Sequence, residues 1–89
     1  MPHLPADLDR RVTELIASLC TVPAAQIAPT DRLREDLGLD SVSSMELLSL
    51  LAEELDLDIE VEEAMAVTTV EGTLEMARRH LSAAAREAV

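Results

Sequence analysis

The sequence predicts an all-α fold: a small four-helix bundle with three longer helices, one short helix before the last, and a long loop between the first two. The 89-residue chain contains no Phe, Tyr or Trp, so aliphatic side chains and methionine must fill its core. This composition favours close-packed helices over a sheet, which is rich in aromatic and β-branched residues. Apolar residues also recur at helical spacing in three separate stretches. A chain of this length forms one domain, which we expect to span residues 1–89 with tails over about 1–6 and 83–89.

The first helix is predicted to begin at Asp7, whose carboxylate suits the cap position. It should end near residues 19–22, because Pro23 disfavours helical geometry in the residue before it. Its apolar residues follow one helical face, made of Leu8, Val12, Leu15, Ile16 and Leu19. A long loop over residues 21–40 comes next, and within it we expect a short helical turn at residues 30–33.

The second helix begins at Asp40 or Ser41 and has two apolar faces. The broad face is a stripe that is predicted to enter the core, made of Leu47, Leu48, Leu51 and Leu55. The small face holds Val42, Met45 and Ser49, with the acidic residues Glu46 and Glu53 beside it. Periodicity leaves two interpretations of the small face open: a docking surface for partners, or an extension of the core.

A short helix is predicted within residues 61–66, and a last long helix follows it. Thr68 and Glu71 have the spacing of a capping box at the start of the last helix. The core face of this helix is predicted to contain Val70, Leu74, Ala77 and Leu81.

The charge of the chain limits the classes of partner it can bind. It has eighteen acidic residues, seven arginines, no lysine and a net charge of −11. Nucleic acids and anionic membranes require clustered cations, so we expect neither as a partner. The acidity suits partners with basic patches, although it also serves plain solubility. No apolar run approaches the roughly 20 residues of a membrane span, and the N-terminus lacks a signal-peptide pattern. We therefore expect a cytoplasmic monomer.

No metal site is predicted. Asp56, Asp58 and Glu60 alternate as in a calcium loop, but valines stand where that loop needs a glycine and an acid. His3 and His80 have no partner at ligand spacing, so we expect both to be exposed surface residues.

Ser41 is the serine best placed for function, because it follows a turn at Gly38 and stands at the start of a helix. A catalytic serine needs a positioned base, and both histidines are remote in sequence. The surroundings of Ser41 are acidic, so no oxyanion site is evident, and we expect no enzyme activity. Two roles remain open for Ser41: a helix cap, or an exposed hydroxyl that another enzyme modifies.

The segment 36–42, DLGLDSV, resembles the phosphopantetheine attachment motif of acyl carrier proteins, D-x-G-x-D-S-L. The similarity continues through MEL at 45–47 and EEL at 53–55 in the second helix, and through DI at 58–59 and EEA at 62–64 near the short helix. VTTV at 67–70 resembles the I-T-T-V start of the last helix in this family. The resemblance covers about residues 8–82.

This resemblance implies that a phosphopantetheinyl transferase attaches 4'-phosphopantetheine, taken from coenzyme A, to Ser41. The thiol of the arm would carry acyl groups as thioesters among acyl-loading, condensing and modifying enzymes, in fatty acid, polyketide or related secondary-metabolite biosynthesis. The surface recognised by basic docking patches on these partners would be Asp40, Val42, Met45, Glu46 and Glu53.

Several departures from the family pattern bear on the pathway. Glu60-Val61 replaces the Pro-Asp that the family often has before its short helix, and Val42, Met45 and Ser49 replace the commoner Leu, Val and Met. The change at the entry to the short helix, Glu60-Val61, favours a specialised pathway. Asp40 before the serine favours an acyl carrier over a peptidyl carrier, while D-alanyl and aminoacyl carriers stay open. The competing class is an acidic helical interaction module that is never modified.

Overall fold

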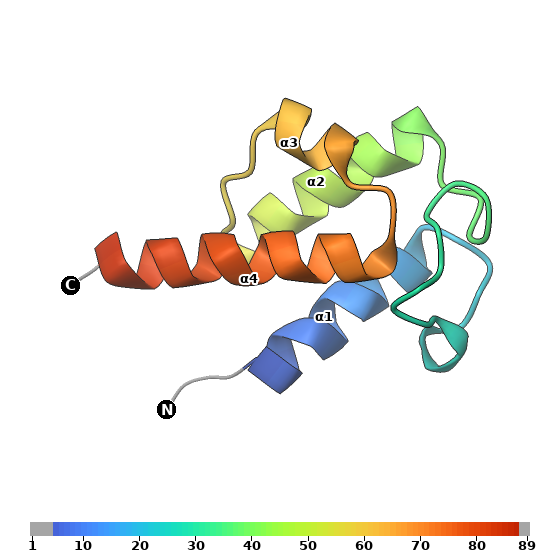
Figure 1. The fold of residues 1–89 in the computed structure, drawn as a ribbon, viewed down its shortest axis with the longest axis horizontal. Coiled ribbons are helices and arrows are strands. Elements are labelled where there is room, and N and C mark those ends of the chain that lie inside the picture. Colours follow the sequence, from blue (N-terminus) through green and yellow to red (C-terminus); the bar gives the residue numbers. More distant parts are fainter. Residues whose placement is uncertain (1–4, 88–89) are drawn as a thin grey trace.

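The computed structural model describes residues 5–87, with side chains described over residues 7–82. Four α-helices and one 3-10 turn follow in order: α1 Pro5–Ser18, η1 Ala24–Gln26, α2 Ser41–Leu55, α3 Val61–Ala66 and α4 Val70–Glu87. Helix α1 packs against α4 and α2, and α3 packs against α2 (Figure 1). The predicted bundle, with its short third helix and long first loop, is confirmed. No helix in the described part of the chain is both long enough and apolar enough to cross a membrane.

Helix α1 begins two residues earlier than predicted, at Pro5. Proline is tolerated in the first turn of a helix, where its missing N–H would have had no partner. Asp7 therefore lies within the first turn instead of capping it. Residues 5–6 and 83–87, which we expected to belong to the tails, have helical backbone, and residues 1–4 and 88–89 lie outside the described chain.

The core forms where the apolar faces of α1, α2 and α4 meet. Leu15 and Leu48 lie at its edge and are partly buried. Leu81, predicted to be a core residue, is 39% exposed, because it lies at the rim of an open cleft between the first turn of α1 and the end of α2. The buried hydrophobic side chains are Leu8, Val12, Ile16, Leu33, Leu37, Leu39, Leu47, Leu51, Leu57, Ile59, Val70, Leu74, Met76 and Ala77.

The link between α2 and α3 contributes two of these core residues. Asp56 ends α2 in the left-handed conformation, with φ of 57°, and its N–H donates to the carbonyl of Leu51. Beyond it, Leu57 and Ile59 are buried while Asp58 is exposed. The alternation of acidic and apolar residues in this link therefore directs its apolar side chains into the core.

The long loop between α1 and α2 is attached to the start of α4. Arg32 forms an isolated antiparallel bridge with Thr69, and the N–H of Leu33 donates to the carbonyl of Thr68 at 2.9 Å. The N–H of Val70 donates to the carbonyl of Asp31 at 3.0 Å. The helical turn predicted at residues 30–33 is therefore wrong, because Arg32 pairs with another segment.

The cap of α4 is Thr69, not Thr68 as predicted. The Oγ1 atom of Thr69 accepts a hydrogen bond from the N–H of Gly72 at 3.0 Å. A Cβ atom at Gly72 would lie 3.1 Å from Cγ1 of Val67 and 3.3 Å from Oγ1 of Thr69. This close approach explains a glycine in the first turn of a long helix.

Helix α3 has no buried residue and is held to α4 by charged contacts. Oε1 of Glu63 lies 2.8 Å from Nε2 of His80, and Oε2 of Glu63 lies 3.3 Å from Nη1 of Arg79. His80 was predicted to be an exposed surface histidine, but it is half-buried against Glu63, a contact that sequence spacing does not reveal. His3 lies outside the described residues.

Candidate functional site

The turn over residues 32–39 leads the chain into α2. The N–H of Leu39 donates to the carbonyl of Leu33 at 2.8 Å, and the N–H of Gly38 donates to the carbonyl of Arg34 at 3.0 Å. Gly38 has φ of +74°, in the region that favours glycine, and a Cβ atom there would meet no other atom within 4 Å. Backbone conformation, not lack of space, therefore requires glycine at this position.

Asp36 closes the same turn. One of its carboxylate oxygens accepts from the backbone N–H of Arg32 at 2.7 Å and from Nε of Arg32 at 3.3 Å. The backbone hydrogen bond is the main cause that lowers the pKa of Asp36, and the Arg32 side chain adds to it. The carboxylate thus stays charged at neutral pH and fixes the turn from its outer side, while Leu33 and Leu37 anchor it in the core.

Asp40 is the N-cap of α2. Its Oδ1 accepts from the N–H of Ser43 at 2.9 Å, and this hydrogen bond is the main cause that lowers the pKa of Asp40. Ser41 is the first residue of the helix and is exposed. The capping role considered for Ser41 is therefore filled by Asp40, and the Ser41 hydroxyl remains available at the surface.

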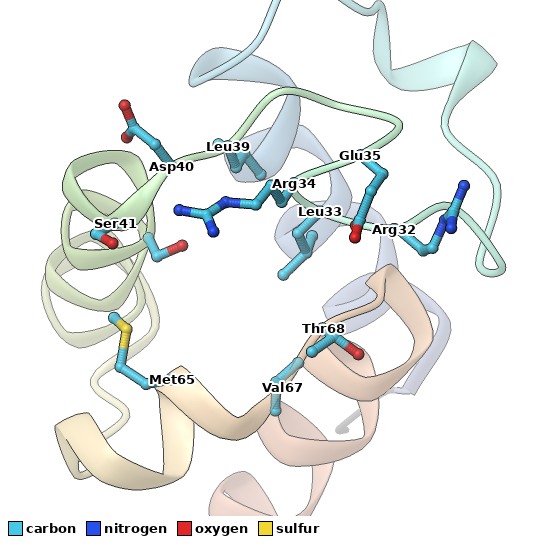
Figure 2. Close-up of a pocket in the computed structure, with 11 residues that line it drawn as sticks. Arg32, Leu33, Arg34, Glu35, Leu39, Asp40, Ser41, Met65, Val67 and Thr68 are labelled. Carbon is cyan, nitrogen blue, oxygen red and sulfur yellow. The ribbon is translucent and has the colours of Figure 1, made fainter.

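A cavity of about 480 Å³ opens beside Ser41 (Figure 2). Its walls come from the turn before α2, the first turn of α2, and the segment between α3 and α4. Figure 2 shows the guanidinium of Arg34 directed toward the start of α2, where Ser41 lies. The lining residues are Arg32, Leu33, Arg34, Glu35, Leu39, Asp40, Ser41, Ser44, Met65, Val67 and Thr68.

These residues suit a phosphopantetheine arm. An exposed serine hydroxyl such as that of Ser41 can accept a phosphodiester, and arginine is a good partner for phosphate oxygens. Leu33, Leu39 and Val67 give the cavity apolar surface along which the carbon chain of the arm can lie. A second cavity of about 20 Å³ lies deeper between α2, α3 and α4, and it shares Leu33 and Ser44 with the first.

The predicted docking residues all lie on the surface. Val42 is 69% exposed and Met45 is 43% exposed, so neither extends the core. Asp40, Glu46 and Glu53 are exposed as well. Helical spacing places the α2 members on one side of the helix, which leaves an apolar strip bordered by acids beside Ser41.

Sequence reasoning missed two residues that line the cavity, Met65 and Arg34. Met65 of α3 is 40% exposed and lines the cavity from the side opposite the turn. The signal was present in the sequence: Val61 and Met65 stand four apart, so they share one face of a six-residue helix. Arg34 carried no comparable signal, because nothing in the spacing places its side chain near Ser41.

Comparison with known proteins agrees with this geometry. The family model described as a phosphopantetheine attachment site matches residues 10–77. Among solved structures, the acyl carrier protein from Enterococcus faecalis has the same fold, with a TM-score of 0.74 and 23% sequence identity. That match covers 88% of this chain and 99% of the other.

The family match accounts for the cofactor, which is a covalently attached 4'-phosphopantetheine. Carriers of this kind are generally non-catalytic and work with a phosphopantetheinyl transferase and biosynthetic enzymes. The helical fold and the attachment motif occur together in this chain. The chain thus belongs to the phosphopantetheine attachment site family, and its fold is that of an acyl carrier protein.

Proposed function

We propose that Ser41 is the attachment residue and that the arm carries acyl groups as thioesters for biosynthetic enzymes. The position of Ser41 supports this most directly: it is exposed at the first residue of α2, with the cap supplied by Asp40 and a cavity alongside. The Ser41 hydroxyl attacks the phosphorus that bears the pantetheine in coenzyme A. A phosphodiester forms, the pyrophosphate bond breaks, the nucleotide leaves, and the transferase takes the proton.

The transferase brings the base and its own Mg²⁺, so this chain needs neither. Among the described residues, no cluster of three His, Cys, Asp or Glu side chains is arranged to hold a metal. The contribution of the chain is to present one hydroxyl at a rigid helix start. The arm then gives its cargo a high effective concentration near each enzyme that docks.

We further propose that Asp40, Val42, Met45, Glu46 and Glu53 form the docking face for these enzymes. Exposed carboxylates increase the rate of encounter with basic patches but do little to slow dissociation. This suits a carrier that must leave each enzyme quickly. The apolar strip of Val42 and Met45 supplies the short-range contact. Fatty acid, polyketide and related secondary-metabolite pathways all fit, and the departure at residues 60–61 favours a specialised one.

The attachment residue is tested by incubating the protein with coenzyme A, Mg²⁺ and a broad-specificity transferase, and then measuring its mass. The wild type should gain one phosphopantetheine unit and Ser41→Ala none. Ser49→Ala, which changes another exposed serine of α2, should gain the unit like the wild type. If an active transferase leaves the wild type unmodified, the chain acts as an acidic interaction module. The mass of the protein isolated from its host distinguishes acyl from D-alanyl or aminoacyl cargo.

The docking face is tested with Glu46→Arg in the same assay. We expect slower modification than wild type at low salt and a smaller difference at high salt, because salt screens exposed charges. Glu75→Arg makes the same charge change on α4, where Glu75 is also exposed, and it should modify at the wild-type rate. Equal rates for Glu46→Arg and wild type at low salt would remove Glu46 from the docking face.

The cytoplasmic location and the monomeric state remain predictions.

A further inference from the structure

Among the charged side chains labelled in Figure 2, that of Arg34 reaches across from the turn toward the start of α2, where Ser41 lies. It is exposed and lines the cavity beside Ser41. Its own backbone is fixed, because its carbonyl accepts from the N–H of Gly38 at 3.0 Å. The guanidinium is thus carried on a rigid turn at the mouth of the cavity.

The arginines near the cavity differ in whether a carboxylate already holds them. Arg32, on the other side of the turn, is paired with Asp36 at 3.3 Å and is also influenced by the charge of Glu35. Arg34 has no carboxylate within ion-pair distance among the side chains described over residues 7–82. Arg34 is therefore the cation of this cavity that remains available to a ligand.

The negative charge around Ser41 would repel a phosphodiester there, and a nearby cation would offset that repulsion. Asp40, the neighbouring residue, accepts the N–H of Ser43, so its carboxylate remains charged at neutral pH. The chain as a whole carries a net charge of −11. A phosphodiester on Ser41 adds a negative charge beside Asp40, and the N–H groups at the start of α2 offset only part of that repulsion.

We propose that Arg34 is a positioning residue that binds the phosphodiester of the arm attached to Ser41. This inference rests on Ser41 being the attachment residue. A planar guanidinium can donate two parallel hydrogen bonds to phosphate oxygens, which fixes orientation as well as charge. The arm then leaves Ser41 along the cavity, with Leu33 and Val67 beside its carbon chain.

The test compares the arm in four modified proteins: wild type, Arg34→Ala, Arg34→Lys and Arg10→Ala. Arg10→Ala removes the same charge from the exposed surface of α1, away from the cavity residues. Mass measurement first establishes that each sample carries the arm, and circular dichroism that each is folded. Nuclear Overhauser contacts between the arm and the methyl groups of Leu33 and Val67 are then recorded, together with the relaxation of the arm amides and the ³¹P shift.

In wild type and Arg10→Ala we expect contacts from the arm to both methyl-bearing residues, restricted arm amides, and a ³¹P shift that depends on salt. Arg34→Ala should lose the contacts and the salt dependence, with the arm amides relaxing as in a free chain. Arg34→Lys should keep the salt dependence but lose most of the contacts, because lysine supplies charge without the planar pair of donors.

Identical contacts and ³¹P behaviour in wild type and Arg34→Ala would overturn the proposal, and so would a wild-type arm that makes no contact with the cavity. If Arg34→Ala only slows the transferase while the attached arm behaves as in wild type, Arg34 contacts the transferase and the proposal is wrong. Failure of the wild type to gain the arm is a different result, because it overturns the attachment at Ser41 itself.

Discussion

Leu47→Ala tests whether α2 separates a core face from a docking face. Leu47 is 5% exposed and borders the small cavity of about 20 Å³ between α2, α3 and α4. Truncating a buried leucine to alanine costs about 2–5 kcal/mol, more where the site cannot collapse around the new void. Because helices hold this site from three directions, we expect a loss of about 3 kcal/mol. That is a large share of the about 5–15 kcal/mol that stabilise a typical domain.

For a domain of this size, each kcal/mol shifts Tm by about 4–8 °C, so Tm should fall by about 12–24 °C. Thermal and urea unfolding followed by the helical circular dichroism signal measures the change. The matched control is Val42→Ala, which truncates a 69% exposed side chain of the same helix and should change stability by no more than about 0.5 kcal/mol. Similar losses in Leu47→Ala and Val42→Ala would refute the assignment of the two faces.

Three further perturbations address the caps and the contact that holds α3. The hydrogen bond from the N–H of Ser43 lowers the pKa of Asp40 in the folded protein. The charged carboxylate of Asp40 therefore stabilises the fold at pH values above the ordinary carboxyl pKa of about 3.9, and this contribution is lost as the pH falls through the lowered pKa of the folded state. The Tm advantage of wild type over Asp40→Asn should therefore shrink in acid, and an advantage that is independent of pH would contradict this. Gly72→Ala should not raise Tm despite the better helix propensity of alanine, because its Cβ would press on Val67 and Thr69; an increase of several degrees would show that they can move aside. Glu63→Gln removes the ion pairs to α4 and should speed amide hydrogen exchange in α3, whereas Glu62→Gln on the same helix should leave exchange unchanged.

The local pattern of the chain was sufficient for most of the architecture. Helical spacing of apolar residues located α2 and most of α1 and α4 to within a few residues, because one buried face with period 3.6 is a property of local sequence. The segment 36–42 likewise identified Ser41 and its turn, since the glycine conformation and the acidic cap depend on neighbouring residues. The expectation of partners with basic patches likewise comes from the sequence, through its net charge of −11.

Contacts between distant segments decided the rest. Arg32 pairs with Thr69 and Leu33 with Thr68, so the loop between α1 and α2 forms a fixed wall of the cavity. His80 meets Glu63 across seventeen positions of sequence, and Leu81 is exposed because it lies at the rim of the open cleft between α1 and the end of α2. Arg34 lines the cavity from a turn that the buried Leu33, Leu37 and Leu39 anchor in the core. The sequence alone determined which serine follows the glycine turn and the acidic cap, whereas long-range packing determined what surrounds it, because such packing depends on residues that no local period or motif relates to Ser41.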